Sequence, residues 1–186
     1  LLTTLSGECL VTLIYHRQLD DAWVQEATQV EKTLKIKVVG RSRGQKLVVS
    51  DDWITEILVV EGRSLTYKQP EQAFIQPNGV VNQEMLGWAC AHAQNSNKDL
   101  LELYCGIGNF TIPLSKHYRR VLATEVSKVA TRAAQETLVL NEVDNVAFAR
   151  LAAEEVTQAM NGEREFRRLK SLDPRLSDYD LATVFV

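Results

Sequence analysis

Two glycines and one distant acid are the residues of this 186-residue chain whose spacing could support chemistry. Gly106 and Gly108 follow an apolar run at residues 100–104, and Glu125 follows a second apolar run, 19 positions after Gly106. Glycine lets backbone approach a ligand where a Cβ would clash, and a carboxylate at a strand end can accept both hydrogen bonds of a ribose diol. The pattern predicts a nucleoside-binding half-site, as in an enzyme with a nucleoside cofactor.

The glycine segment CGIGNF narrows the choice of cofactor. A dinucleotide fingerprint carries a third glycine where this chain has Thr111, so a dehydrogenase is disfavoured. A cofactor without a pyrophosphate, such as S-adenosylmethionine, does not need that phosphate cradle. The glycines alone fit a structural turn equally well, and Glu125 shifts the balance towards a ligand loop. Cys105 could be read as a nucleophile, but a small half-buried loop residue is the favoured interpretation.

Elements that would position these residues alternate between strand and helix after residue 69. This alternation predicts an α/β fold with a parallel sheet and right-handed crossovers. Asn78 is a candidate cap for the helix that follows it, whose expected apolar side carries Val80, Val81, Met85, Leu86, Ala89 and Cys90. Strands are expected at 100–104, 121–125, 146–150 and 181–186, and helices at about 109–117, 127–141 and 153–161.

The first 68 residues predict a different order of elements. Residues 1–16 predict a hairpin, and Asp20 or Asp21 can cap a helix that extends to about Lys35. Short strands separated by glycine turns follow, which predicts a mixed α+β module with mainly antiparallel pairing. The expected domains are therefore 1–68 and 69–186, and the later strands of the first are expected at 36–39, 47–49, 54–60 and 65–68.

Composition limits the classes of protein. Apolar residues make up 45% and charged residues 24% of the chain, as in a soluble globular protein. A net charge of −3 offers no global basic field for nucleic acid, although a local patch suffices. The three distant cysteines form neither a metal-ligand spacing nor a disulfide framework, which favours a reducing cytoplasm. No apolar run approaches the length of a membrane helix.

Several charged residues keep two interpretations. Glu154 and Glu155 follow the third expected strand and could accept from an adenine amino group or simply favour a helix start. Basic residues between positions 32 and 46 could contact RNA phosphates, but acids at 51–56 dilute them. The segment 164–175 is a slightly better RNA candidate. The residues concerned are Lys32, Lys35, Lys37, Arg41, Arg43 and Lys46, then Arg164, Arg167, Arg168, Lys170 and Arg175.

Several segments resemble the bacterial tRNA (uracil-5-)-methyltransferase family. They are AFIQPN, LLELYCGIGNF, RVLATEVS, RLAAEEVTQAMNGEREF and, near the start, LLTTLSGECLVTLIYHRQLDDAW. AAEEVTQAMNG and FIQPN are far more specific than the glycine loop, and the resemblance covers almost the whole chain. It implies a Rossmann-like S-adenosylmethionine methyltransferase sheet preceded by part of a small α+β RNA-binding module.

The resemblance also implies which residues bind S-adenosyl-L-methionine. The glutamine of the family's FxQPN motif falls on Gln76, and the tyrosine and asparagine of its glycine loop fall on Tyr104 and Asn109. Its strand-end acid falls on Glu125, where the spacing already suggests a ribose ligand. The expected cofactor-binding set is therefore Gln76, Tyr104, Gly106, Asn109 and Glu125.

The family's substrate is the T-loop uridine (position 54) of tRNA, with the related loop of transfer-messenger RNA (tmRNA) as a second target. In the family chemistry a thiolate adds to C6 of the flipped uracil. The resulting enolate takes the sulfonium methyl at C5, and a base then removes the C5 proton. The resemblance thus implies a cytoplasmic, metal-free enzyme that is a monomer when complete.

The chain departs from the family at its C-terminal end. There, a strand resembling LATVFV runs into an Asp-Pro-Pro-Arg motif, with the catalytic cysteine and glutamate beyond it, but this chain stops at Val186. We therefore expect an internal piece that lacks catalytic residues and C-terminal strands. It should be inactive alone and prone to associate through an unpaired edge. Two alternatives remain: a ribosomal RNA uracil-5-methyltransferase, and a non-catalytic remnant that binds RNA or cofactor.

Overall fold

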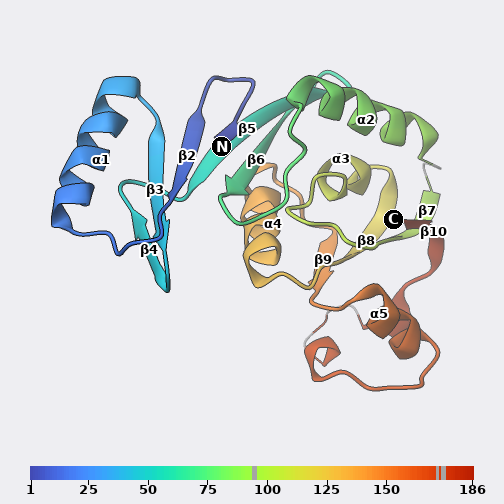
Figure 1. Cartoon of the computed structure of the whole chain (residues 1–186). Helices are drawn as coiled ribbons and strands as arrows, with labels where there is room; N and C mark the ends of the chain where they lie inside the picture. Colours follow the sequence, from blue (N-terminus) through green and yellow to red (C-terminus); the bar gives the residue numbers. More distant parts are fainter. Residues whose placement is uncertain (94–95, 171, 173–174) are drawn as a thin grey trace.

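The computed structural model describes residues 1–93, 96–170, 172 and 175–186. Figure 1 shows an N-terminal sheet with one helix at one end of the molecule and a helix-covered parallel sheet at the other, with a long hairpin between them. Part of the basic segment 164–175 lies outside the described residues.

The C-terminal half contains the expected parallel sheet. Its strands are β7 (Ser96–Glu102), β8 (Tyr118–Thr124), β9 (Val146–Ala149) and β10 (Leu181–Phe185), in the order β10-β7-β8-β9. All three pairings are parallel. The intervening helices are α3 (Thr111–Ser115), α4 (Lys128–Leu140) and α5 (Ala153–Met160), with short 3-10 turns at Arg167–Leu169 and Leu176–Asp178. The α/β prediction is confirmed.

The two central strands, β7 and β8, are buried on both faces at residues 100–102 and 121–124, which explains the apolar runs there. Successive residues of a strand point to opposite faces, so Leu100 and Val121 enter one hydrophobic cluster, whereas Leu101 and Leu122 enter another. The first cluster packs under helices α3 and α4, and the second under α5. The carboxyl ends of the strands are thereby held fixed between two layers.

The N-terminal sheet has the order β1-β2-β3-β4. Its strands are β1 (Leu2–Thr3), β2 (Cys9–Ile14), β3 (Lys37–Ser42) and β4 (Gln45–Val48), and helix α1 (Asp21–Leu34) connects β2 to β3. Asp20 caps α1, as expected, by accepting from the backbone N–H of Trp23 at 2.9 Å. The β2–β3 pair is parallel, whereas the other pairs are antiparallel. A helical crossover between neighbouring strands imposes this exception.

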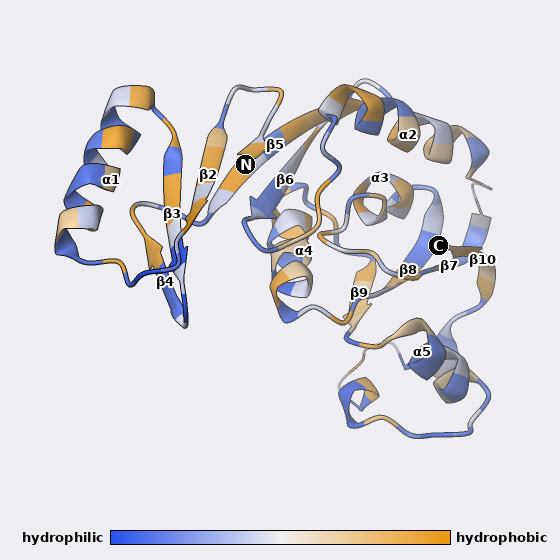
Figure 2. Ribbon diagram, viewed as in Figure 1, coloured by the Kyte–Doolittle hydropathy of each residue, from blue (hydrophilic) through white to orange (hydrophobic). Residues whose placement is uncertain are grey.

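A long hairpin, β5 (Trp53–Val60) and β6 (Arg63–Pro70), connects the two halves. Figure 2 shows hydrophobic residues concentrated along β5 and on α2 (Gly79–His92). The inner side chains of the hairpin share one hydrophobic cluster with the parallel sheet and with α2. The proposed division at residue 68 stays a prediction, because β6 crosses it and packs with the second half.

Helix α2 begins where expected but buries only part of the expected apolar side, together with one polar residue. Asn78 caps it, accepting from the backbone N–H of Val81 at 3.0 Å. Leu86, Ala89 and Cys90 are buried as the apolar pattern predicts, and so is the polar Asn82, at 4% exposure. Val80, Val81 and Met85, also expected on the apolar side, are substantially exposed. No helix in the described part of the chain is long and apolar enough to cross a membrane.

Candidate functional site

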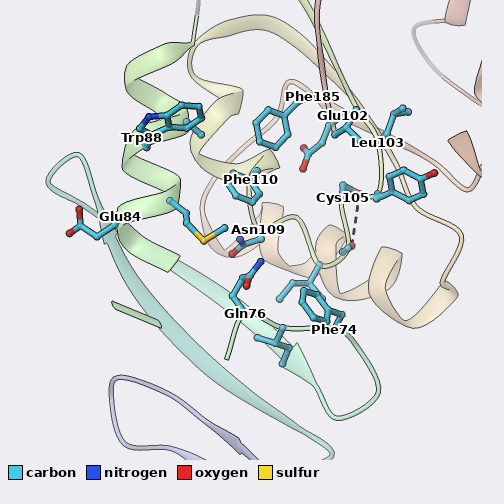
Figure 3. A pocket seen from close by; sticks show the side chains of 17 residues that line it. Phe74, Gln76, Glu84, Trp88, Glu102, Leu103, Cys105, Asn109, Phe110 and Phe185 are labelled. Atoms are coloured by element: carbon cyan, nitrogen blue, oxygen red, sulfur yellow. Dashed lines mark hydrogen bonds between the residues drawn. The ribbon is translucent and has the colours of Figure 1, made fainter. Parts of the chain in front are cut away.

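A cavity of about 720 Å³ opens at the carboxyl end of β7, between the glycine loop, helix α2 and the segment before it. Its walls are mainly aromatic and aliphatic, with Phe110 and Phe185 in ring contact at 4.9 Å between centroids. Figure 3 shows these rings beside Trp88, with Gln76 and Asn109 along another side. Its size and apolar lining with a few polar groups are typical of small-molecule sites.

The glycine loop adopts backbone conformations that favour glycine at two positions. Gly106 and Gly108 have φ of 58° and 84°, in the left-handed region that glycine adopts without strain. Tyr104 has φ of 57°, which costs a non-glycine residue free energy and is often found at functional sites. A Cβ built on Gly106 would meet no atom within 4 Å. The space next to this backbone is therefore open to a ligand.

Four of the five expected cofactor residues line this cavity. They are Gln76, Tyr104, Gly106 and Asn109. Figure 3 shows the carboxamide of Gln76 directed towards Asn109. The side chain of Asn109 is held by Asn82 of α2, since each carboxamide donates to the other at 2.9 Å. Tyr104 is 61% exposed, so its ring forms part of the pocket rim.

Glu125, the fifth expected residue, is outside the described lining of the cavity. Its Oε2 accepts from the backbone N–H of Gly106 at 3.1 Å, and its Oε1 accepts from the backbone N–H of Ser127 at 2.7 Å. The carboxylate thus fixes the first glycine of the loop to the end of β8. A carboxylate has about four acceptor positions, so both oxygens keep capacity for a diol.

Glu102 is a pocket residue that the sequence motifs did not predict. It ends β7, is 2% exposed and lines the cavity. Its Oε2 has no hydrogen-bond partner among the described residues, and Figure 3 shows its carboxyl group beside Phe185. Burial raises the pKa of Glu102 to about 8. A buried acid with an unpartnered oxygen is suited to receive a cationic group of a ligand.

This raised pKa gives a testable dependence of stability on pH. Folded Glu102 keeps its proton to higher pH than unfolded Glu102, whose pKa is near 4.5. The free energy of unfolding should therefore fall as pH rises from about 5 to 8, by up to about 4 kcal/mol. Glu102→Gln, neutral throughout, should lack this fall in urea titrations at pH 5.5 and 8.5. Parallel losses in wild type and variant would refute the assignment, and the exposed Glu154→Gln serves as control.

Cys105 lies in the pocket wall but is unsuited to attack. It is 4% exposed, and burial raises the pKa of its thiol far above the usual value, with Glu102 and Glu125 adding to the shift. The thiolate, which is the reactive form, is therefore strongly disfavoured. This agrees with the structural interpretation of Cys105.

The acidic pair after β9 divides into two roles. Glu155 starts α5 by accepting from the backbone N–H of Ala152 at 3.0 Å, and it also accepts from Arg168 at 2.8 Å. Glu154 is exposed and is outside the described pocket lining. The helix-start interpretation therefore fits Glu155, and contact of Glu154 with adenine has no support in this geometry.

Carboxylates neutralise part of the first basic cluster. Arg41 donates to Glu71 through Nε at 2.8 Å and Nη2 at 2.6 Å. The Nζ of Lys46 lies 2.6 Å from Oδ2 of Asp52. The Nζ of Lys37 lies 3.2 Å from Oδ2 of Asp51. These three cations stabilise the module internally, which leaves Lys32, Lys35 and Arg43 as the cluster's candidates for RNA phosphates.

One group of side chains has the composition of a metal site. Ligand atoms of Glu61, Cys90 and His117 lie within 4.8 Å of one another. Lys116 already forms an ion pair with Glu61, and this cation hydrogen-bonds to Glu61 and lowers its pKa. A divalent cation would have to displace the ammonium group, so the cluster is best described as an ion pair beside a buried thiol.

Comparison with known proteins shows the family to which this chain belongs. The family model described as tRNA (Uracil-5-)-methyltransferase matches residues 1–186. The chain belongs to this family. A tRNA/tmRNA (uracil-C(5))-methyltransferase from Acinetobacter baylyi is 56% identical over 100% of the chain and 51% of the relative. One from Neisseria meningitidis serogroup B is 53% identical with the same coverage. The chain spans about half the length of these curated relatives.

A solved structure supports the fold assignment within the tRNA (uracil-5-)-methyltransferase family. Pyrococcus abyssi tRNA (uracil-54, C5)-methyltransferase, solved with S-adenosyl-L-homocysteine, matches with a TM-score of 0.56 at 18% identity. The match covers 80% of this chain and 37% of that chain. The Rossmann-like methyltransferase fold expected from the sequence is therefore confirmed.

Proposed function

We propose that this chain forms the S-adenosylmethionine-binding half of a tRNA (uracil-5-)-methyltransferase. The observation that carries the proposal is the cavity at the carboxyl end of β7, which Gln76, Tyr104, Gly106 and Asn109 line together. Ligands of open α/β sheets bind at this edge. Membership of the family and the names of its relatives support the choice of reaction, and the S-adenosyl-L-homocysteine bound in the solved Pyrococcus abyssi structure supports the choice of cofactor.

The residues present fit this cofactor. The open space beside Gly106 can accept part of a ligand against the backbone, and the apolar walls at Phe110 and Phe185 suit a flat ring or a thioether-like stem. The unpartnered Oε2 of Glu102 is suited to an ammonium or sulfonium group. When bound, the cofactor supplies an electrophilic methyl group.

Each chain residue then has a defined task. Glu125 fixes Gly106 and offers its remaining acceptor positions to the ribose hydroxyls. Gln76 and Asn109 offer amide donors and acceptors on one side of the cavity. Glu102 holds a proton while the cavity is free of cations and releases it when a cationic ligand arrives, since the nearby positive charge lowers its pKa.

The substrate of the complete protein is proposed to be C5 of the T-loop uridine in tRNA, and the matching loop of tmRNA. The names of the relatives support both RNAs. The complete enzyme is proposed to act as a cytoplasmic monomer without a metal, and the three unpaired cysteines are consistent with a reducing compartment. The thiol of Cys105 is held protonated, so we expect no methyl transfer by these 186 residues alone.

A chimera tests the function. This chain would replace the matching half of the Acinetobacter baylyi relative, and transfer of labelled methyl from S-adenosylmethionine to a T-arm RNA would be measured. We expect methylation of the T-loop uridine by the chimera and none by the isolated chain. A T-arm RNA with cytidine at the target position should accept no methyl group.

The same assay separates the alternatives. Methylation of a ribosomal RNA hairpin in place of the T-arm would favour the ribosomal enzyme. A folded chimera that binds S-adenosylhomocysteine yet methylates neither RNA would favour a non-catalytic remnant. Methyl transfer by the isolated chain would overturn the expectation that these 186 residues are inactive alone.

A further inference from the structure

Two buried side chains outside the parallel sheet hold the glycine loop through Asn109. Tyr67 of β6 donates its hydroxyl to the backbone carbonyl of Asn109 at 3.0 Å. Asn82 of α2 forms the reciprocal carboxamide pair with the Asn109 side chain, at 2.9 Å in both directions. One loop residue is therefore fixed at its backbone by the hairpin and at its side chain by a helix.

Both holding groups are buried where an unpaired polar group would be costly. Tyr67 is 1% exposed and Asn82 is 4% exposed, and buried polar atoms need hydrogen-bond partners. Among the described residues, the Tyr67 hydroxyl and the Asn82 carboxamide both hydrogen-bond to Asn109. Asn82 also lies on a helix whose other buried residues are apolar. If packing were the only requirement at position 82, an apolar side chain would meet it as well as Asn82 does.

The pairing also sets what Asn109 can offer a ligand. A carboxamide has two N–H donors and two acceptor positions, and the pair with Asn82 uses one of each. Asn109 lines the pocket, whereas Tyr67 and Asn82 are outside its described lining. The remaining donor and acceptor of Asn109 are consequently presented to the cavity in a fixed orientation.

The holding elements are themselves fixed to their neighbours. On either side of Tyr67, the backbone N–H of Thr66 donates to Asn141 at 2.9 Å, and that of Lys68 donates to Thr137 at 3.2 Å. The backbone N–H of Val59 on β5 donates to Gln83, next to Asn82 on α2, at 2.6 Å. Hairpin, helix and glycine loop therefore form one connected polar set, and a shift of the hairpin would displace Asn109.

We propose that Tyr67 and Asn82 are positioning residues of the cofactor site. Through them, cofactor affinity depends on how the β5–β6 hairpin packs against α2 and the glycine loop. They act through Asn109 and do not touch the ligand. The inference rests on the proposed function, since the ligand named is S-adenosylmethionine or its product. It adds a mechanism by which the N-terminal half of the chain governs the methyl-donor site.

The first test removes one hydroxyl from each of two buried tyrosines. Tyr67→Phe deletes the bond to Asn109, and the control Tyr118→Phe deletes a bond of similar burial to Thr183 at 3.2 Å. Both variants should lower the melting temperature by a similar few degrees. In titration calorimetry, Tyr67→Phe alone should weaken S-adenosylhomocysteine binding, by about fivefold. Equal affinity in Tyr67→Phe and Tyr118→Phe would overturn the role of Tyr67.

The second test is a double-mutant cycle on Asn82 and Asn109. Asn82→Ala should weaken S-adenosylhomocysteine binding in the wild-type background and add no further loss in an Asn109→Ala background, because its effect passes through that side chain. Additive losses would overturn the positioning role of Asn82. A purely structural role would lower the melting temperature of both single variants without this coupling.

Hydrogen exchange separates failure of this inference from failure of the proposed function. A wild-type chain that binds no S-adenosylhomocysteine would refute the proposed cofactor. The positioning role is then judged by exchange of the backbone amides at 105–110. These amides should exchange faster in Tyr67→Phe than in wild type or Tyr118→Phe, and unchanged protection would overturn the inference.

Discussion

Glu125→Ala should weaken the binding of S-adenosylhomocysteine by about 10- to 100-fold. The carboxylate fixes Gly106 and Ser127 through their backbone N–H groups at 3.1 and 2.7 Å. Alanine leaves these donors without their acceptor and removes the positions proposed for the ribose hydroxyls, a loss of about 1–3 kcal/mol. Titration calorimetry on the chain at pH 7.5 measures the effect.

Two matched variants make this result specific. Glu125→Gln keeps the shape and one acceptor oxygen, so it should bind with intermediate affinity. Glu26→Ala removes an exposed carboxylate from α1 in the other half of the chain and should bind like wild type. Wild-type affinity in Glu125→Ala would refute both the ribose contact of this acid and the dependence of the site on its hydrogen bonds to the loop.

Asp99→Asn should lower the free energy of unfolding by about 3 kcal/mol at pH 7. Asp99 is fully buried at the junction of β7 and β10, where it accepts from Arg119 at 2.9 and 2.8 Å, from Arg120 at 2.9 Å, and from the backbone N–H of Asp180 at 2.8 Å. The amide leaves two guanidinium groups without a counter-charge. These groups are 48% and 25% exposed, which keeps the cost below that of a fully buried pair.

The pH dependence of this loss has a definite sign. Burial opposes ionisation, but hydrogen bonds from Arg119 and Arg120 prevail and lower the pKa of Asp99 below its usual value near 3.8. The contribution of Asp99 to stability is therefore present above about pH 4 and is lost as pH falls below it. Urea titrations should give a constant gap between wild type and Asp99→Asn from pH 8 to 5, and a smaller gap below pH 4.

Asp180→Asn is the control for Asp99→Asn. Oδ1 of Asp180 lies 3.4 Å from the Nζ of Lys98, and both side chains are more than half exposed. An exposed pair of this kind contributes about 0–1 kcal/mol. Losses of equal size in Asp99→Asn and Asp180→Asn would contradict the central role of the buried aspartate.

The order of elements could be predicted because its signals are local. Parallel strands that are buried on both faces leave continuous apolar runs, as at 121–124, and short polar side chains such as Asp20 and Asn78 cap helices within three residues. The limits of the first strand were less accurate. It ends at Glu102, and Tyr104, which extended the apolar run, adopts a left-handed turn.

Three pocket-supporting residues were not predicted, each for a physical reason. Glu102 stands within an apolar run, where residue type says nothing about whether a carboxyl faces a cavity. Tyr67 and Asn82 reach Asn109 across 42 and 27 positions of the chain. Contacts of this length depend on how the hairpin and α2 pack on the sheet, which no spacing rule describes.

The sequence by itself determined the family of the chain, the strand–helix alternation and the glycine loop with its distant acid, since these depend on motifs and on backbone preferences of neighbouring residues. Only the tertiary structure decided how the loop is held. It brings Gln76 and Asn109 to one cavity, directs the carboxylate of Glu125 to the backbone of Gly106, and buries Glu102 beside the site. These are properties of packing between distant segments, and burial changes the chemistry of the groups that it encloses.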